Sequence, residues 1–472
     1  MNPTRIEHDL LGEREVPAER YYGIQTLRAL ENFDITGISI AHYPRLIHSL
    51  AYIKKAAALT NYALGLLPQS TANAIARACD DLIAGQYHSE FVVDVIQGGA
   101  GTSTNMNANE VIANRALEIL GFEKGRYDLI HPLNHVNLSQ STNDVYPTAL
   151  RLTLSQKMDG LMREMETVRA ALAAKGSEFA DVIKMGRTQL QDAVPMTLGQ
   201  EFGAWAVMVG EDIERVREAQ ALIREINMGA TAIGTGLNAH PDYAALVTHK
   251  LRELSGVPVI MSHNLVEATQ DTGAYVQVSG VLKRVAVKLS KICNDLRLLS
   301  SGPRAGLHEI NLPPMAPGSS IMPGKVNPII PEVVNQVAFE VIGNDLTVTM
   351  AAEAGQLELN VMEPVIAFNL FRSLDMLGRA CHTLSEHCIK GITANREVCR
   401  RMVENSIGLV TALNPLLGYE KSTEIASLAM STGRSVYEIV LEKGYLTQAE
   451  LDDVLSPENM TRPRYLHKRV NA

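Results

Sequence analysis

The most regular pattern of hydrophobic positions in the chain lies between residues 278 and 299. Apolar residues recur there at alternating intervals of four and three positions: Val278, Leu282, Val285, Leu289, Ile292, Leu296 and Leu299. This is a heptad seam sustained over three repeats. It predicts a long helix that packs almost parallel to its neighbours at shallow crossing angles.

Helical periodicity recurs in four further stretches, which we interpret as long helices: 148–174, 198–226, 331–352 and 364–389. The last begins with Pro364 in its first turn and ends just before Gly391, the positions that these residues prefer at helix ends. Between 204 and 209 the second stretch has almost no polar face. Such a helix needs neighbours on all sides, so we predict a bundle that is completed by identical subunits.

The chain is expected to divide into three domains. A length of 472 residues is compatible with about three domains at roughly 150 residues each. Changes in periodicity place them at 1–140, a mixed and mostly helical domain, at 141–394, the bundle, and at 395–472, a small helical domain. The predicted fold class is therefore mainly α.

Composition narrows the functional classes. Hydrophobic residues make up 46% and aromatic residues 5% of a chain with a net charge of −9, which favours a helical globular protein and disfavours nucleic-acid binding. No apolar stretch is long enough to span a bilayer and no secretory leader is recognisable, so we expect a cytoplasmic protein without a membrane partner. Five cysteines, an odd number in a long chain, are expected to be free thiols.

Three polar segments interrupt the apolar background, at 101–107, 139–144 and 318–328. Each combines glycine or small hydroxyl and amide residues in a way that suits anion binding by backbone N–H groups and side chains. A solvated loop explains any one of them, but three together favour a site for a negatively charged ligand.

The third segment, Gly-Ser-Ser-Ile-Met-Pro-Gly-Lys-Val-Asn-Pro, closely resembles the signature loop of the aspartase/fumarase superfamily. Segments 97–109, 131–147, 186–193 and 301–307 are also similar to this superfamily, so that the resemblance covers essentially the whole chain. Residues 10–12, 21–29 and 343–364 resemble its aspartate ammonia-lyase branch, with class II fumarase as the nearest alternative.

The resemblance implies a three-domain fold and a homotetramer, with a long central helix bundle and active sites that are each built from three subunits. It also implies reversible elimination of ammonia from L-aspartate to give fumarate, with no redox cofactor, no prosthetic group and no resident metal. Activation by a divalent cation is a family expectation. The 317–328 loop suits a lid that closes over substrate and excludes water.

Proton removal next to a carboxylate creates an aci-carboxylate dianion, which requires preorganised donors worth about 3–4 kcal/mol each. By family match Ser319 is the general base, acting as an alkoxide. The positions that match substrate-binding residues are Thr102, Ser141, Thr142, Asn143, Thr188, Ser320, Lys325 and Asn327. Of these, the four hydroxyl residues Thr102, Ser141, Thr142 and Ser320 would hold the developing dianion.

One position departs from the fumarase pattern. Gln189 stands where fumarases and some ammonia-lyases have a histidine, which would pair with a carboxylate matched here by Glu332. Glutamine cannot shuttle a proton, so we expect Gln189 and Glu332 to lie near the site without a catalytic role, and this disfavours a hydratase. A catalytically silent helical scaffold is the alternative from another class, but it would not need Ser319, Lys325 or Asn327.

Overall fold

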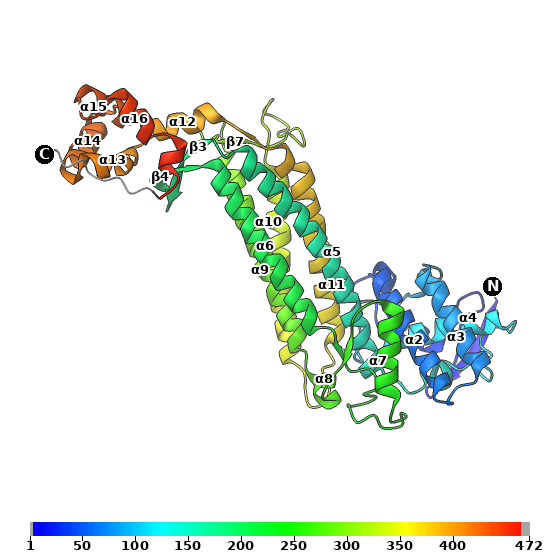
Figure 1. Ribbon diagram of the computed structural model, residues 1–472. Helices are drawn as coiled ribbons and strands as arrows, with labels where there is room; N and C mark the ends of the chain where they lie inside the picture. The colour runs from blue at the N-terminus through cyan, green and yellow to red at the C-terminus, as the bar shows by residue number, and fades with distance from the viewer. Residues whose placement is uncertain (1–2, 464–472) are drawn as a thin grey trace. The chain divides into compact units, whose positions relative to one another are not determined.

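The computed structural model describes residues 3–463 and is mainly helical, with only short two-stranded sheets among these residues. This confirms the predicted fold class. Five long helices carry the predicted bundle (Figure 1): α5 (Thr142–Glu178), α6 (Leu198–Leu222), α9 (Gly273–Leu299), α10 (Ile329–Glu353) and α11 (Glu363–His387). All five were expected from periodicity, and α5 and α9 begin several residues earlier than the pattern indicated.

The heptad seam of α9 is confirmed by burial. All seven of its apolar side chains are at most 4% exposed. Polar contacts tie α9 and α10 together, since the hydroxyl of Ser279 donates to Asp345 at 2.8 Å and the amide of Asn335 donates to the backbone carbonyl of Ser290 at 3.1 Å. A continuous apolar seam with polar contacts along its edges is the packing that heptad spacing predicts.

The described chain forms two compact units. Within the described residues, unit 1 comprises 3–162, 214–284 and 339–377, and unit 2 comprises 163–213, 285–338 and 378–463. Each long helix contributes residues to both units. The division into three domains at 140 and 394 stays a prediction, and residues 464–472 of the expected C-terminal domain lie outside the described residues.

Unit 1 holds the N-terminal elements and the ends of the bundle helices. Its additional strands and helices are β1 (Thr4–Asp9), β2 (Gly12–Pro17), α1 (Ile24–Asn32), η1 (Ile40–His42), α2 (Pro44–Ala63), α3 (Gln69–Ile83), η2 (His88–Glu90), α4 (Thr102–Ile119), η3 (Pro132–Val136), β5 (Glu225–Ile226), α7 (Tyr243–Ser255), β6 (Ile260–Met261) and α8 (Leu265–Gln270). Strands β1 and β2 form an antiparallel hairpin, whereas β5 and β6 pair in parallel.

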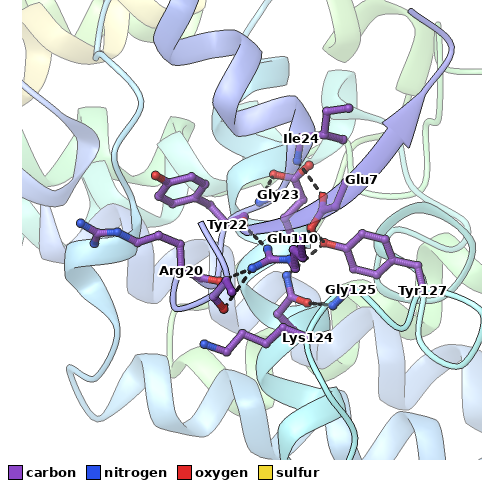
Figure 2. A network of polar contacts seen from close by, with 12 residues as sticks. Glu7, Arg20, Tyr22, Gly23, Ile24, Glu110, Lys124, Gly125 and Tyr127 are labelled. Carbon is purple, nitrogen blue, oxygen red and sulfur yellow. Dashed lines mark hydrogen bonds and ion pairs between the residues drawn. The ribbon is translucent and has the colours of Figure 1, made fainter. Parts of the chain in front are cut away.

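Two buried carboxylates fix the start of α1 (Figure 2). Glu110, on α4, accepts a hydrogen bond from the backbone N–H group of Gly23. It also accepts from the backbone N–H groups of Gln25 and Thr26. Glu7, on β1, accepts from the N–H of Ile24 at 2.8 Å. Burial raises the pKa of Glu110 to about 7, although the hydrogen bonds that Glu110 accepts from Gly23, Gln25 and Thr26 oppose this shift. The unpaired N–H groups of the helix start thereby bind α1 to both β1 and α4.

Unit 2 contains β3 (Ile183–Thr188), β4 (Gln191–Thr197), β7 (Ile310–Asn311), η4 (Ile389–Gly391), β8 (Thr393–Ala394) and the C-terminal helices. These helices are α12 (Arg396–Asn405), α13 (Leu409–Leu417), α14 (Tyr419–Thr432), α15 (Val436–Glu442), α16 (Gln448–Val454) and α17 (Pro457–Met460). Buried residues of α12 to α16 share one hydrophobic cluster with Met185 of β3. The C-terminal segment is therefore helical, as expected, and packs against the β3–β4 hairpin.

Candidate active site

The first polar segment forms the start of α4 in unit 1. Thr102 is the first residue of this helix, is exposed, and donates from Oγ1 to the carbonyl of Gly99 at 2.7 Å. Gly101 before it has φ +89°, and a Cβ there would lie 2.3 Å from the ring of Tyr146. Only glycine fits this close approach, so the sequence fixes where α4 begins and places Thr102 at its N-terminus.

The second polar segment leads into α5 in the same unit. Ser141, Thr142 and Asn143 are half-buried. The backbone N–H of Asn143 donates to Ser141 Oγ at 3.2 Å, and the amide of Asn105, on α4, donates to Thr142 Oγ1 at 3.0 Å. The Asn143 amide nitrogen donates to the carbonyl of Ala232 at 2.7 Å, so its oxygen is the end that is available to accept a hydrogen bond.

Asp144 holds this segment in place from within the protein. It is fully buried, and its carboxylate accepts from the backbone N–H groups of Ser141, Gly229 and Thr231 at 3.0 to 3.2 Å. Burial raises its pKa to about 7, and the three donors oppose that shift. Asp144 therefore joins the 139–144 segment to the loop that follows β5. The composition of the segment did not reveal this structural role.

The signature loop lies in unit 2. Ser319 is half-buried, and its Oγ accepts hydrogen bonds from the backbone N–H groups of Ile321 at 3.2 Å and Met322 at 3.0 Å. Two N–H dipoles directed at one hydroxyl oxygen stabilise its alkoxide relative to its alcohol form. This is the electrostatic environment that a serine base requires.

The loop is closed on itself by Gly318 and Asn327. A Cβ at Gly318 would lie 1.8 Å from the carbonyl oxygen of Lys325, so the two ends of the loop approach more closely than any side chain allows. The amide of Asn327 donates to the carbonyl of Gly318. Ser320 and Lys325 project from this frame as exposed side chains.

The β3–β4 hairpin of unit 2 carries Thr188 and Gln189, both exposed. Thr188 pairs with Gln191, so that Gln189 and Leu190 form a two-residue turn with φ +55° and +61°. Two consecutive left-handed residues define a type I′ turn, which prefers Asn-Gly. A Gln-Leu pair in this turn is strained by about 1–3 kcal/mol per residue.

Replacing Leu190 by glycine is expected to raise the thermal stability of the protein. Leu190 is 72% exposed, so little apolar burial is lost, whereas relief of the left-handed strain contributes about 1 kcal/mol. The control is Leu190→Ala, which removes the same side chain but keeps a Cβ. Equal melting temperatures for the two variants in differential scanning calorimetry would show that the turn is not strained.

The structure thus groups the predicted residues into two sets. Thr102, Ser141, Thr142 and Asn143 lie at the adjoining starts of α4 and α5 in unit 1. Unit 2 holds the others, with Ser319, Ser320, Lys325 and Asn327 on one loop, Thr188 and Gln189 on the hairpin, and Glu332, half-buried, in the first turn of α10. The roles of these residues stay predictions.

Sequence reasoning did not identify a buried ion network behind β3. Glu309 is 0% exposed and lies 2.9 Å from Lys184 Nζ and 2.7 Å from an Arg187 guanidinium nitrogen. Lys184 Nζ also contacts Glu201 Oε2 on α6 at 2.5 Å. The network anchors the strand that ends at Thr188. A lysine inside the apolar run of β3 was the signal that could have revealed it.

Within residues 3–463, no group of three or more His, Cys, Asp and Glu side chains is arranged to hold a metal ion. The five cysteines are buried free thiols, which confirms the sequence prediction. Over the same described residues, no helix has the length and apolar character needed to cross a membrane.

Comparisons with known proteins agree with this architecture. A lyase family model matches residues 12–343, and a model of the fumarase C C-terminus matches 409–462. The chain is 62% identical to the aspartate ammonia-lyase of Helicobacter pylori over 464 residues, covering 98% of this chain and 99% of the relative. It is 55% identical to the aspartate ammonia-lyase of Escherichia coli over 469 residues, covering 99% and 98% of the two chains.

Solved structures show the same fold. A crystal structure described as fumarate lyase:delta crystallin from Brucella melitensis, bound to cobalt, superposes with a TM-score of 0.96 at 57% identity, covering 98% of this chain and 100% of that one. A class II fumarase from Schistosoma mansoni superposes with a TM-score of 0.93 at 36% identity, with the same coverage.

Proposed function

Because the chain belongs to the aspartase/fumarase superfamily of lyases, we propose that it catalyses the reversible deamination of L-aspartate to fumarate and ammonia. The observation that carries this proposal is full-length identity of 55–62% to aspartate ammonia-lyases, against 36% to a class II fumarase. Gln189, which cannot act as an acid or base, also favours a lyase over a hydratase.

In the proposed mechanism, the Ser319 alkoxide takes the proton from the carbon next to the side-chain carboxylate. The electron pair of the broken C–H bond moves into that carboxyl group and gives the aci-carboxylate dianion. The dianion then collapses, a carbon–carbon double bond forms, and the C–N bond breaks. The amino group is already an ammonium, so it leaves as neutral ammonia without a general acid.

The site residues would stabilise the two negatively charged species of this mechanism, the Ser319 alkoxide and the aci-carboxylate dianion. Two backbone N–H groups at Ser319 Oγ stabilise the base. Hydroxyls of Thr102, Ser141, Thr142 and Ser320 would hold the dianion, each good donor contributing about 3–4 kcal/mol. Lys325, Asn327 and Thr188 would bind the other carboxylate, and the Asn143 oxygen would accept from the ammonium.

We include a homotetramer in the proposal, with each active site built from segments of three subunits. The supporting observation is an apolar stripe on α10 in unit 1, where Phe339, Leu346 and Met350 are 63%, 61% and 64% exposed, and Ile342 lies on the same stripe. Exposed side chains at helical spacing on a long helix are typical of a face that another helix covers.

Substituting Phe339 and Leu346 together by glutamate is expected to dissociate the tetramer and abolish activity. An unpaired charge in an apolar interface costs several kcal/mol, and sites shared between subunits cannot survive dissociation. Light scattering after size exclusion would measure the mass. The control is Met430→Glu, which alters an apolar residue on α14 that is 72% exposed. A double variant that keeps the mass of the wild type, as the control should, would contradict the interface.

The proposal is tested by following fumarate absorbance in the ultraviolet with purified protein and either L-aspartate or L-malate. Product from aspartate alone supports the lyase, whereas product from malate alone would replace it with a hydratase. No product from either would favour a scaffold. We also propose that the enzyme requires no cofactor but is activated by a divalent cation. Repeating the aspartate assay with a chelator and then with added Mg²⁺ measures this activation.

We also propose the cytoplasm as the compartment. The five buried free thiols fit an environment in which cysteines stay reduced.

A further inference from the structure

Lys54 is a buried cation outside the proposed catalytic residues. It lies on α2 of unit 1 with 0% of its surface exposed. Its Nζ donates to two side-chain amide oxygens, Asn137 Oδ1 at 2.8 Å and Gln140 Oε1 at 2.9 Å. Burying an ammonium costs several kcal/mol unless its surroundings compensate, so the position of Lys54 requires an explanation.

The ammonium fixes the direction of the Asn137 amide. An ammonium has three donors and no acceptor, so the oxygen of Asn137, not its nitrogen, must face Lys54. That same oxygen accepts from the amide nitrogens of Asn105 and Asn109, each at 3.2 Å. Asn105 and Asn109 are therefore held with their NH₂ groups toward Asn137.

The direction of Asn105 in turn determines what the Thr142 hydroxyl can do. The Asn105 amide nitrogen donates to Thr142 Oγ1 at 3.0 Å. Thr142 thus acts as an acceptor in this contact, and its hydroxyl hydrogen is left to donate to another group. A hydroxyl with its hydrogen available is what binding of a carboxylate requires.

This orientation carries a cost. Asn105 Oδ1 and Asn109 Oδ1 are buried and make no hydrogen bond to any residue that the structure describes. Each buried acceptor without a hydrogen bond lowers the stability of the fold. The two asparagine side chains would therefore not adopt this orientation without another group that favours it. The buried cation imposes it together with the backbone carbonyl of Gln140, which accepts from the Asn137 amide nitrogen at 3.2 Å.

We propose that Lys54 is a positioning residue for the reaction. By fixing the direction of the amide chain from Asn137 through Asn105, it directs the Thr142 hydroxyl hydrogen toward the substrate carboxylate and supports the 137–142 segment with a positive charge. The inference rests on the proposed function, because it takes Thr142 as a carboxylate ligand.

Two titratable groups face Lys54 from neighbouring elements, Asp144 on α5 and Cys79 on α3. Burial lowers the pKa of Lys54 to about 7, and the negative charge of Asp144 is the larger influence that opposes this shift. Burial raises the pKa of the Cys79 thiol well above its usual range, so that it stays neutral. Once Lys54 loses its proton, its amine can accept a hydrogen bond and no longer imposes one direction on Asn137.

A double-mutant cycle tests the proposal in the full-length enzyme. Lys54→Met is expected to lower kcat/KM for aspartate at least tenfold. Thr142→Val is expected to have a large effect in the wild type and an effect several-fold smaller in the Lys54→Met background, because the two residues act through one chain of contacts. Equal effects of Thr142→Val in both backgrounds would overturn the proposal.

The matched control is Lys55→Met, the adjacent lysine, whose Nζ pairs with the exposed Asp80 at 2.6 Å. It is expected to retain kcat/KM within about twofold, since an ion pair whose carboxylate is 53% exposed to solvent contributes little. A wild type that does not convert aspartate would refute the proposed function itself, whereas an active wild type with an additive cycle refutes only the role of Lys54.

A second measurement does not depend on whether Lys54→Met folds. The inhibition constant of succinate is measured from pH 6 to 9 and is expressed for the fully ionised dianion, because part of succinate still carries a proton near pH 6. We expect succinate binding to weaken above about pH 7 in the wild type, and this pH dependence to be much smaller in Thr142→Val. A binding constant with the same pH dependence in both proteins, or with none in the wild type, would overturn the proposal.

Discussion

Replacement of Ser319 by alanine is expected to lower kcat for aspartate deamination about a thousandfold, within the range that a general base contributes. The Oγ that would be lost is the acceptor of two backbone N–H groups, so the variant removes the base together with the contact that stabilises its alkoxide. KM is expected to change little, because Ser319 is proposed to take the proton and not to bind either carboxylate.

The measurement is steady-state kinetics of fumarate formation, with the melting temperature recorded for each protein. Ser431→Ala provides a matched control, since Ser431 is an exposed serine on α14 whose Oγ contacts a backbone carbonyl. It should behave as the wild type. A Ser319→Ala enzyme with kcat within tenfold of the wild type would require another group to act as the base.

Substitution of Glu309 by glutamine is expected to lower the stability of the protein more than neutralising an exposed carboxylate does. Glu309 is fully buried between Lys184 and Arg187. In the Glu309→Gln variant both cations remain, but the only carboxylate of the network is Glu201, which pairs with Lys184. Removing one partner of a buried pair costs about 3–5 kcal/mol. A decrease in melting temperature of about 5 °C or more is expected at fixed protein concentration.

The matched control for this variant is Glu404→Gln. Glu404 pairs with Arg400 at 2.8 Å, but both side chains are exposed, so its loss should cost less than about 1 kcal/mol. Because β3 ends at Thr188, Glu309→Gln should also raise KM for aspartate. Equal melting temperatures for Glu309→Gln and Glu404→Gln would mean that the buried network does not stabilise the hairpin.

The long helices were predictable because their signal is local. The spacing of apolar residues along a helix specifies which face is buried, and the seven seam residues of α9 are all buried in the structure. The signature loop was recognisable for a similar reason, since its glycines, prolines and polar residues are adjacent in sequence. Gly318 is an example, because the close approach to Lys325 that requires a glycine lies within the same loop.

By itself, therefore, the sequence determined the fold class, the bundle helices, the free thiols and the segments that carry the candidate site. Only the tertiary structure decided which charged residues are buried and what they contact. Lys54 reaches amides that lie 83 and 86 residues further along the chain, and Lys184 meets Glu309 from a distant segment. No local pattern encodes such contacts, because burial of a charge depends on partners that folding brings together, not on the residues beside it in sequence.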